Sequence, residues 1–125
     1  MLLELAATWV TAGEGAPLLG YACVVAKVHV LEPFHLPADD AAAFWRDVDI
    51  AASALADVFA PLKINYEIHG NTIPHLHVHL YPRTLDDPLA GQRLTTKELV
   101  RRPAALLARI RDALVRRAAR RKPSA

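Results

Sequence analysis

The sequence predicts an α+β domain, because strand-like and helix-like hydrophobic periods follow one another along its 125 residues. Apolar residues recur at three and four positions over residues 39–60, which is typical of a helix. Alternation over residues 75–81 and a β-branched apolar run over residues 20–30 indicate strands. A chain of this length forms one domain with its own core, and no apolar run approaches the roughly 18 residues needed to span a membrane.

The first two strands are predicted from short apolar and β-branched runs. Residues 7–11 form a short strand that ends at a turn over residues 13–17, and Trp9 is expected in the core rather than on a base-stacking surface. Residues 20–30 form the longer second strand. Cys23 is the only cysteine, which excludes an internal disulfide and predicts a small buried hydrophobe in a reducing cytoplasm.

A long helix is predicted between the second and third strands, over residues 39–60. Its first turn contains Asp39 and Asp40, where the helix dipole favours anions, and Pro61 follows its last residue. Three more carboxylates are expected on its solvated face: Asp47, Asp49 and Asp57.

A hairpin is predicted after this helix. Residues 63–69 form the third strand, and the turn over residues 70–72 returns the chain to pair antiparallel with the alternating segment. In that segment His75, His77 and His79 project from one face of the strand, while the apolar residues between them enter the core.

Three imidazoles at every second position allow several kinds of site. Each two-residue step advances about 6.6 Å, so the outer imidazoles lie roughly 13 Å apart and cannot share one metal with bonds of about 2.0–2.1 Å. Two neighbours could bind Zn²⁺ with a third ligand from elsewhere, for which His29, His35, His69 and the Asp and Glu residues are available. Alternatively, one imidazole attacks an anionic substrate while its neighbours hold charge or move protons. The remaining alternative is a solvated histidine-rich face.

The sequence His-Leu-His-Val-His-Leu-Tyr of residues 75–81 resembles the signature of the histidine triad (HIT) family, His-φ-His-φ-His-φ-φ with φ apolar. The resemblance covers about residues 18–88 and implies an antiparallel sheet of about four to five strands with helices on one side, often completed as a homodimer. The flanks resemble the bacterial diadenosine polyphosphate hydrolase-like branch: Pro74, Pro82-Arg83, Asp86-Asp87-Pro88, residues 63–67 and Gly70-Asn71.

The resemblance implies a covalent mechanism on a purine nucleotide. His77 would attack the α-phosphate of a nucleoside 5′-phosphate conjugate, such as a dinucleoside polyphosphate or a phosphoramidate, and form a nucleotidyl-histidine intermediate. His75 and His79 would contact phosphate oxygens or support the leaving group. No metal or other cofactor is required in this scheme, and Mg²⁺ would act only as part of the substrate.

Further substrate contacts follow from the same resemblance, with two departures from it. Asn65, Asn71 and Thr72 are expected to act as neutral donors near the scissile phosphate. Tyr21 stands where the family often has a histidine, and a phenol donates a hydrogen bond but supplies no cationic imidazole. Residues 11–14 lack the Asp or Asn that holds the ribose in the family, so Glu14 is the only nearby candidate.

The last part of the chain is basic, whereas the rest is acidic. Residues 1–96 hold five Lys and Arg against eleven Asp and Glu, and residues 97–125 hold ten against two. We expect residues 95–125 to be a basic helical extension of one domain spanning residues 1–125, with the helix starting at Pro103. The acidic body argues against nucleic-acid binding, which the basic tail leaves open. The helix is expected to expose an arginine face: Arg102, Arg109, Arg116 and Arg120.

The favoured function is therefore a nucleotide hydrolase or nucleotidyl transferase. Two alternatives stay open: a nucleotide-binding regulatory module with little turnover, and a metal-dependent hydrolase that uses two of the strand histidines. Residues 1–5 lack the basic and long apolar segments of a signal peptide, which predicts a cytoplasmic protein.

Overall fold

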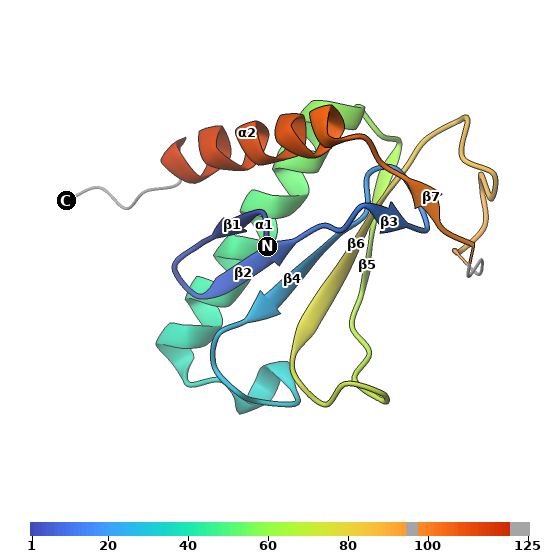
Figure 1. Cartoon of the computed structure of the whole chain (residues 1–125). Coiled ribbons are helices and arrows are strands. Elements are labelled where there is room, and N and C mark those ends of the chain that lie inside the picture. The colour runs from blue at the N-terminus through green and yellow to red at the C-terminus, as the bar shows by residue number, and fades with distance from the viewer. Residues whose placement is uncertain (95–97, 121–125) are drawn as a thin grey trace.

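The computed structural model describes residues 1–94 and 98–120, and its centre is a five-stranded antiparallel sheet (Figure 1). The strands lie in the order β1-β2-β4-β6-β5, which confirms the predicted α+β class and sheet size. Two short strands, β3 (Gly15–Ala16) and β7 (Val100–Arg101), pair beside this sheet. The strands of the main sheet are β1 (Leu3–Glu4), β2 (Thr8–Thr11), β4 (Ala22–Ala26), β5 (Lys63–Glu67) and β6 (His77–Arg83).

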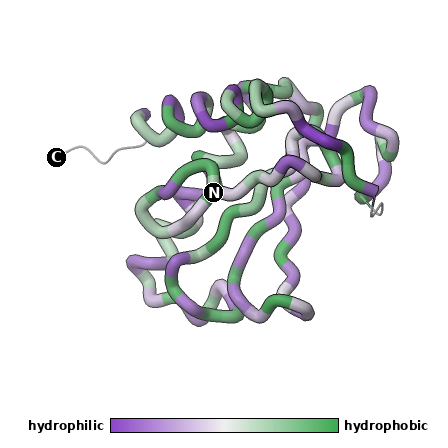
Figure 2. Tube along the Cα trace, in the orientation of Figure 1, coloured by the Kyte–Doolittle hydropathy of each residue, from purple (hydrophilic) through white to green (hydrophobic). Residues whose placement is uncertain are grey.

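The long helix α1 (Ala38–Phe59) packs across one face of the sheet and lies within one residue of its predicted bounds. Phe44, Val48 and Leu55 project from it into the core, where they meet the apolar side chains of β4 and β6. Figure 2 shows β4 as hydrophobic along its length, as expected for a central strand. One face of the sheet is therefore buried under α1. The opposite face is not covered by α1 and carries the side chains of the alternate strand positions.

The C-terminal helix α2 (Ala104–Arg120) packs against α1 and β1. Ile110, Ala113 and Leu114 belong to the same core as the sheet. Hydrophilic and hydrophobic residues alternate along the helix (Figure 2). Residues 95–97 and 121–125 of the expected basic extension lie outside the described residues. None of the described helices is long and apolar enough to cross a membrane.

The second strand is shorter at both ends than predicted, and the histidine strand begins two residues later than predicted. β4 ends at Ala26, because the amide of Val30 bonds to the carbonyl of Val28 in a tight turn. β6 begins at His77, because the His75 amide bonds to the Ile73 carbonyl. His75 therefore precedes the strand instead of lying on it.

A buried carboxylate decides which face β2 turns to the core. Oδ2 of Asp47 accepts hydrogen bonds from the Thr8 hydroxyl at 3.0 Å and from the Ala7 amide at 2.8 Å. The predicted solvated position of Asp47 is wrong, since the residue is 2% exposed and burial raises the pKa of its carboxyl. Thr8 and Val10 consequently point inward, so the prediction of Trp9 as a core residue is also wrong.

Candidate active site

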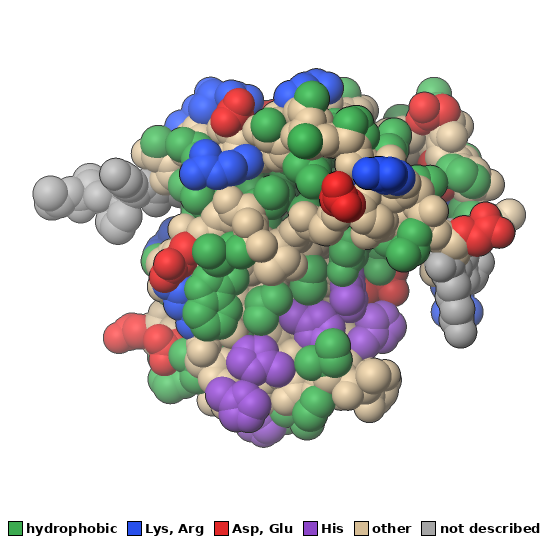
Figure 3. All heavy atoms as spheres, viewed as in Figure 1, with side chains coloured by type: hydrophobic (Ala, Val, Ile, Leu, Met, Phe, Trp, Pro, Cys, Tyr) green, Lys and Arg blue, Asp and Glu red, His purple; other side chains and the backbone are tan. Residues whose placement is uncertain are grey.

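The sheet face opposite α1 carries the predicted histidines, and Figure 3 shows histidine side chains gathered on it. The antiparallel register brings residues of four strands side by side there. Every second side chain of each strand points to this face, and the registers align these side chains across the strands in two rows. The first row is Trp9, Val25 and His77, and the second is Thr11, Cys23, His79 and Glu67.

The hydrogen bonds of His77 define its tautomer. Its Nδ1 lies 2.6 Å from the backbone carbonyl oxygen of His75, and a carbonyl only accepts. Nδ1 therefore carries the hydrogen, and Nε2 keeps an unshared electron pair. His77 is half-buried and lines two hollows of this face, which makes Nε2 available as a nucleophile.

His79 lies next to His77, and their ring centroids are 4.8 Å apart in an edge-to-face arrangement. The Tyr21 hydroxyl lies 2.8 Å from Nδ1 of His79. We assign the proton of this bond to the phenol, so that Nδ1 accepts and Nε2 carries a hydrogen. Burial is the main cause that lowers the pKa of His79, followed by His77 and His69, whereas Glu67 raises it. His79 is thus a neutral N–H donor facing the nucleophile.

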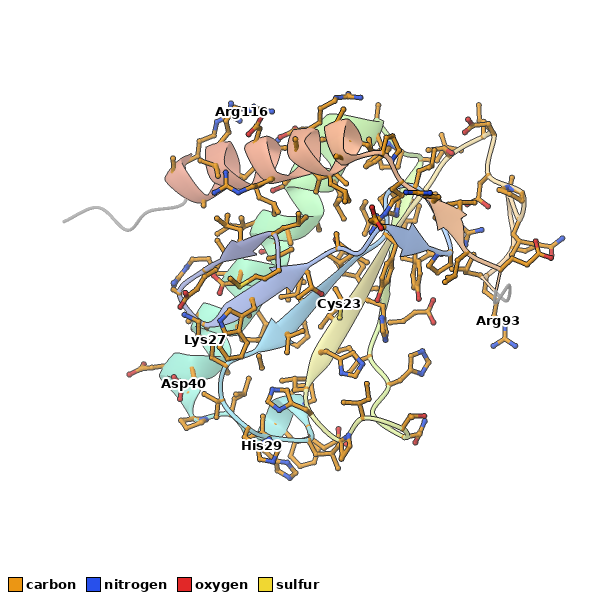
Figure 4. All side chains as sticks on the ribbon, in the orientation of Figure 1. Cys23, Lys27, His29, Asp40, Arg93 and Arg116 are labelled. Carbon is orange, nitrogen blue, oxygen red and sulfur yellow. The ribbon has the colours of Figure 1, made fainter. Side chains whose placement is uncertain are left out.

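Tyr21 is itself held in a packed aromatic cluster. Its ring stacks on His79 at 5.8 Å and on Tyr81 at 5.1 Å between centroids. Burial raises the pKa of the Tyr21 phenol and, to about 12, that of Tyr81, so both keep their protons near neutral pH. Cys23, labelled in Figure 4, lies on β4. It is buried as predicted, and burial raises the pKa of its thiol.

Both ring nitrogens of His75 are engaged by the protein. Nε2 donates to the Ala26 carbonyl at 2.6 Å, and Nδ1 lies 2.9 Å from Nδ1 of His29, the loop residue labelled in Figure 4. His29 must donate in the second bond, because the hydrogen of neutral His75 is already on Nε2. In this structure the first triad histidine therefore orients the loop beside His77 and offers no free nitrogen to a phosphate.

Two hollows meet at the triad and share Ile73, His77 and His79. We call the first, of about 430 Å³, the tryptophan groove; its other lining residues are Trp9, Thr11, Tyr21, Cys23, Val25 and His75. We call the second, of about 320 Å³, the loop pocket; its other lining residues are His69, Gly70, Asn71 and Thr72.

The expected neutral donors fall into different places. Asn71 and Thr72 line the loop pocket beside the triad, and Gly70 between them and β5 has a φ of +137° that favours glycine. Asn65 instead accepts a hydrogen bond from Nη1 of Arg83 at 2.9 Å and lines a separate hollow. The Glu14 side chain is exposed and lines neither of the two triad hollows.

A buried arginine supports the segment that carries Tyr21. Arg102 is 1% exposed, so its predicted place on a solvated face is wrong. Its guanidinium donates to the carbonyls of Tyr21 at 2.5 Å, Leu19 at 3.0 Å and Gly13 at 2.6 Å. Gly20 lies so close to Pro82 that a Cβ there would approach within 2.7 Å of it. Both contacts hold in place the backbone segment that carries the Tyr21 phenol.

The sequence does not identify Trp9, His29 or His69 as neighbours of the triad, although all three are near it. The sequence indicated only that His29 and His69 could serve as additional imidazoles. Their distance from the triad could not be predicted, because it depends on strand register and on the path of the loops. Within residues 1–94 and 98–120, no three His, Cys, Asp or Glu side chains are grouped so that they could hold a metal ion.

Comparison with known proteins places this geometry in a family. The model of the HIT domain matches residues 16–85. No curated protein matches the sequence.

Solved structures share the fold at low identity. A histidine triad protein from Bradyrhizobium japonicum is 22% identical with a TM-score of 0.79, covering 92% of this chain and 87% of that chain. A histidine triad protein from Sinorhizobium meliloti is 24% identical with a TM-score of 0.67, covering 74% and 73%. A zinc-bound histidine triad family protein from Mycobacterium smegmatis is 20% identical with a TM-score of 0.66, covering 92% and 83%.

Proposed function

Because the chain belongs to the HIT domain family, whose members are in general nucleotide-binding hydrolases or transferases, we propose that it cleaves nucleoside 5′-phosphate conjugates at the α-phosphate. The substrate class is a purine dinucleoside polyphosphate or a nucleoside phosphoramidate, as in the diadenosine polyphosphate hydrolase-like branch. The proposal includes a homodimer as the working form.

The observation that carries the proposal is the tautomer of His77. The hydrogen bond from Nδ1 to the His75 carbonyl leaves the electron pair on Nε2, which faces the hollows where a substrate would lie. An imidazole with a free Nε2 is a nucleophile without prior loss of a proton. The buried neighbour His79 presents an N–H that stabilises charge developing on the phosphate oxygens.

The reaction would have two steps. Nε2 of His77 forms a bond to the α-phosphorus, and the bond from phosphorus to the leaving group breaks with its electron pair on that group. Water then forms a new oxygen–phosphorus bond, while the phosphorus–nitrogen bond breaks and its electron pair returns to His77. A second acceptor in place of water would make the protein a transferase.

The two hollows suggest where the parts of the substrate would lie. Trp9 and Val25 give the tryptophan groove an apolar floor suited to a nucleobase, with the base stacked on the indole. Asn71 and Thr72 give the loop pocket neutral donors suited to the phosphates and the leaving group. The triad lies where the two hollows meet, under the expected position of the α-phosphorus.

The test is detection of the covalent adduct. Wild-type protein mixed with adenosine phosphoramidate and quenched without acid should carry a nucleotidyl group, and His77→Ala should carry none. His77→Ala should also lose several orders of magnitude in kcat while its nucleotide affinity stays near that of the wild type, because Trp9, Val25, Asn71 and Thr72 still line the two hollows.

The matched control is His35→Ala, which removes an exposed histidine that lines neither triad hollow. It should keep the adduct and the turnover. If wild-type protein binds purine nucleotides but gives no adduct and no turnover over a panel of conjugates, the regulatory-module alternative replaces this proposal. Loss of turnover on treatment with a chelator would favour the metal-dependent alternative.

A further inference from the structure

A histidine paired with a carboxylate lies at the end of β5, beside the triad. Nε2 of His69 lies 3.0 Å from Oε1 of Glu67. A carboxylate accepts the hydrogen of an imidazole, so Nε2 carries that hydrogen and Nδ1 keeps an electron pair. Among residues 1–94 and 98–120, no hydrogen-bond partner of His69 other than Glu67 is found. The Glu67–His69 pair therefore has the arrangement of an oriented base.

The Glu67–His69 pair belongs to the same hollow as the nucleophile. His69 lines the loop pocket together with His77 and His79, and its ring centroid lies 5.9 Å from that of His79. Glu67 is the register partner of His79 across β5 and β6. The His69 side chain is 56% exposed, so water reaches it from solvent.

Elimination singles out His69 among the imidazoles of the loop pocket once the nucleotidyl intermediate has formed. Nε2 of His77 is then bonded to phosphorus, and its Nδ1 donates to a carbonyl. Nδ1 of His79 accepts from Tyr21, so its Nε2 bears a hydrogen and has no pair to offer. His69 alone retains a free basic nitrogen in that pocket. The ionisable side chains that face it are Glu67 on β5 and His77 and His79 on β6.

We propose that the Glu67–His69 pair is the general base of the hydrolytic half-reaction, an inference that rests on the proposed nucleotidyl transfer. In an in-line displacement, water approaches phosphorus from the side that the leaving group has vacated, opposite Nε2 of His77. Nδ1 of His69 removes a proton from this water as its oxygen bonds to phosphorus and the phosphorus–Nε2 bond breaks. The resulting imidazolium is stabilised by the Glu67 carboxylate and returns its proton to solvent.

The experiment separates the two half-reactions with adenosine 5′-(p-nitrophenyl phosphate), whose leaving group departs without protonation. Rapid mixing records the p-nitrophenolate burst, which reports adduct formation, and the steady state, which reports hydrolysis. His69→Gln should keep the burst rate within about threefold and lower the steady-state rate by about 10²-fold, the lower end of the range for a general base. Glu67→Gln should lower the steady-state rate by a smaller factor, because the imidazole remains.

Two further arms exclude a merely structural role. Added imidazole should restore hydrolysis to His69→Gly, and hydroxylamine, a nucleophile that needs little base assistance, should discharge the adduct of His69→Gln at the wild-type rate. His35→Gln, a change of another exposed histidine that lies in a different loop, should leave both phases unchanged.

The outcomes are distinguishable. A His69→Gln variant with wild-type steady-state hydrolysis, or one whose burst and steady state fall together without rescue, overturns the role of the Glu67–His69 pair and leaves the proposed function intact. Absence of any p-nitrophenolate release by the wild type overturns the proposed function itself, and the inference with it.

Discussion

The hydrogen bond between Tyr21 and His79 can be tested by removing one oxygen atom. Tyr21→Phe deletes the hydroxyl that lies 2.8 Å from Nδ1 of His79 and keeps the ring that stacks on Tyr81. A net hydrogen bond between neutral groups contributes about 0.5–1.5 kcal/mol. Because the phenol donates to the neutral imidazole, its loss removes a stabilisation of the uncharged form and raises the pKa of His79.

The size of the effect follows from that energy. At 1.36 kcal/mol per pKa unit, the pKa of His79 should rise by roughly 0.4–1.1 units, and the preference for the tautomer with a hydrogen on Nε2 should fall by about 2- to 13-fold. NMR titration of the imidazole proton signals measures the first quantity. A fall of similar size in kcat/KM for a phosphoramidate measures the second.

The sign of the shift decides between the two directions of the bond. If His79 donated to the phenol oxygen, the bond would favour the imidazolium, and Tyr21→Phe would lower the pKa of His79 instead. That result would refute the assigned tautomer. Tyr81→Phe is the control, because it removes a phenol that stacks on the same imidazole and for which no hydrogen-bond partner is found in the described part of the chain.

Two predictions concern stability, measured by urea denaturation. Arg102→Lys keeps the charge but loses the planar guanidinium that donates to three carbonyls. It should lower the free energy of unfolding by about 2–4 kcal/mol. The control Arg101→Lys changes an exposed arginine and should lower the free energy of unfolding by less than about 0.5 kcal/mol. Asp47→Asn should remove a pH dependence: the folded-state pKa is raised above 3.8, so the stability that Asp47 contributes is complete below that pH and declines as pH rises through the raised value. The wild type should therefore lose stability relative to Asp47→Asn on going from pH 3.5 to 7, and a constant difference would show that the carboxyl is not perturbed.

The elements governed by local periodicity were predictable. The α1 helix and the antiparallel pairing of β5 with β6 follow from the spacing of apolar residues and the Gly70 turn, which act over a few positions. The triad motif of residues 75–81 indicated the family from one short segment, and the match of the HIT domain to residues 16–85 confirms it. The donors Asn71 and Thr72 fall beside the triad because the same turn carries them.

Features decided by contacts between distant segments could not be predicted. The inward face of β2 depends on a carboxylate 39 residues away, and no local rule distinguishes Thr8 from Trp9 as the buried member. The engagement of His75 by His29 depends on a loop 46 residues upstream. Arg102 looked like one more residue of a basic face, and only the path of β7 beside β3 gives it three carbonyls to bind.

The Arg102 contacts also determine the order in which the site can be completed as the chain is made. Every strand of the main sheet and the whole triad precede residue 102, whereas the guanidinium that holds Tyr21 closes a loop of 81 residues. At a synthesis rate of about 5–20 residues per second, a nascent chain has its five strands for seconds before this arginine leaves the ribosome. During that interval the Tyr21 carbonyl lacks the hydrogen bond from Nη1 of Arg102. Nascent chains stalled on the ribosome before and after residue 102 has emerged should therefore differ in the order of the Tyr21 segment, although both contain the complete histidine motif.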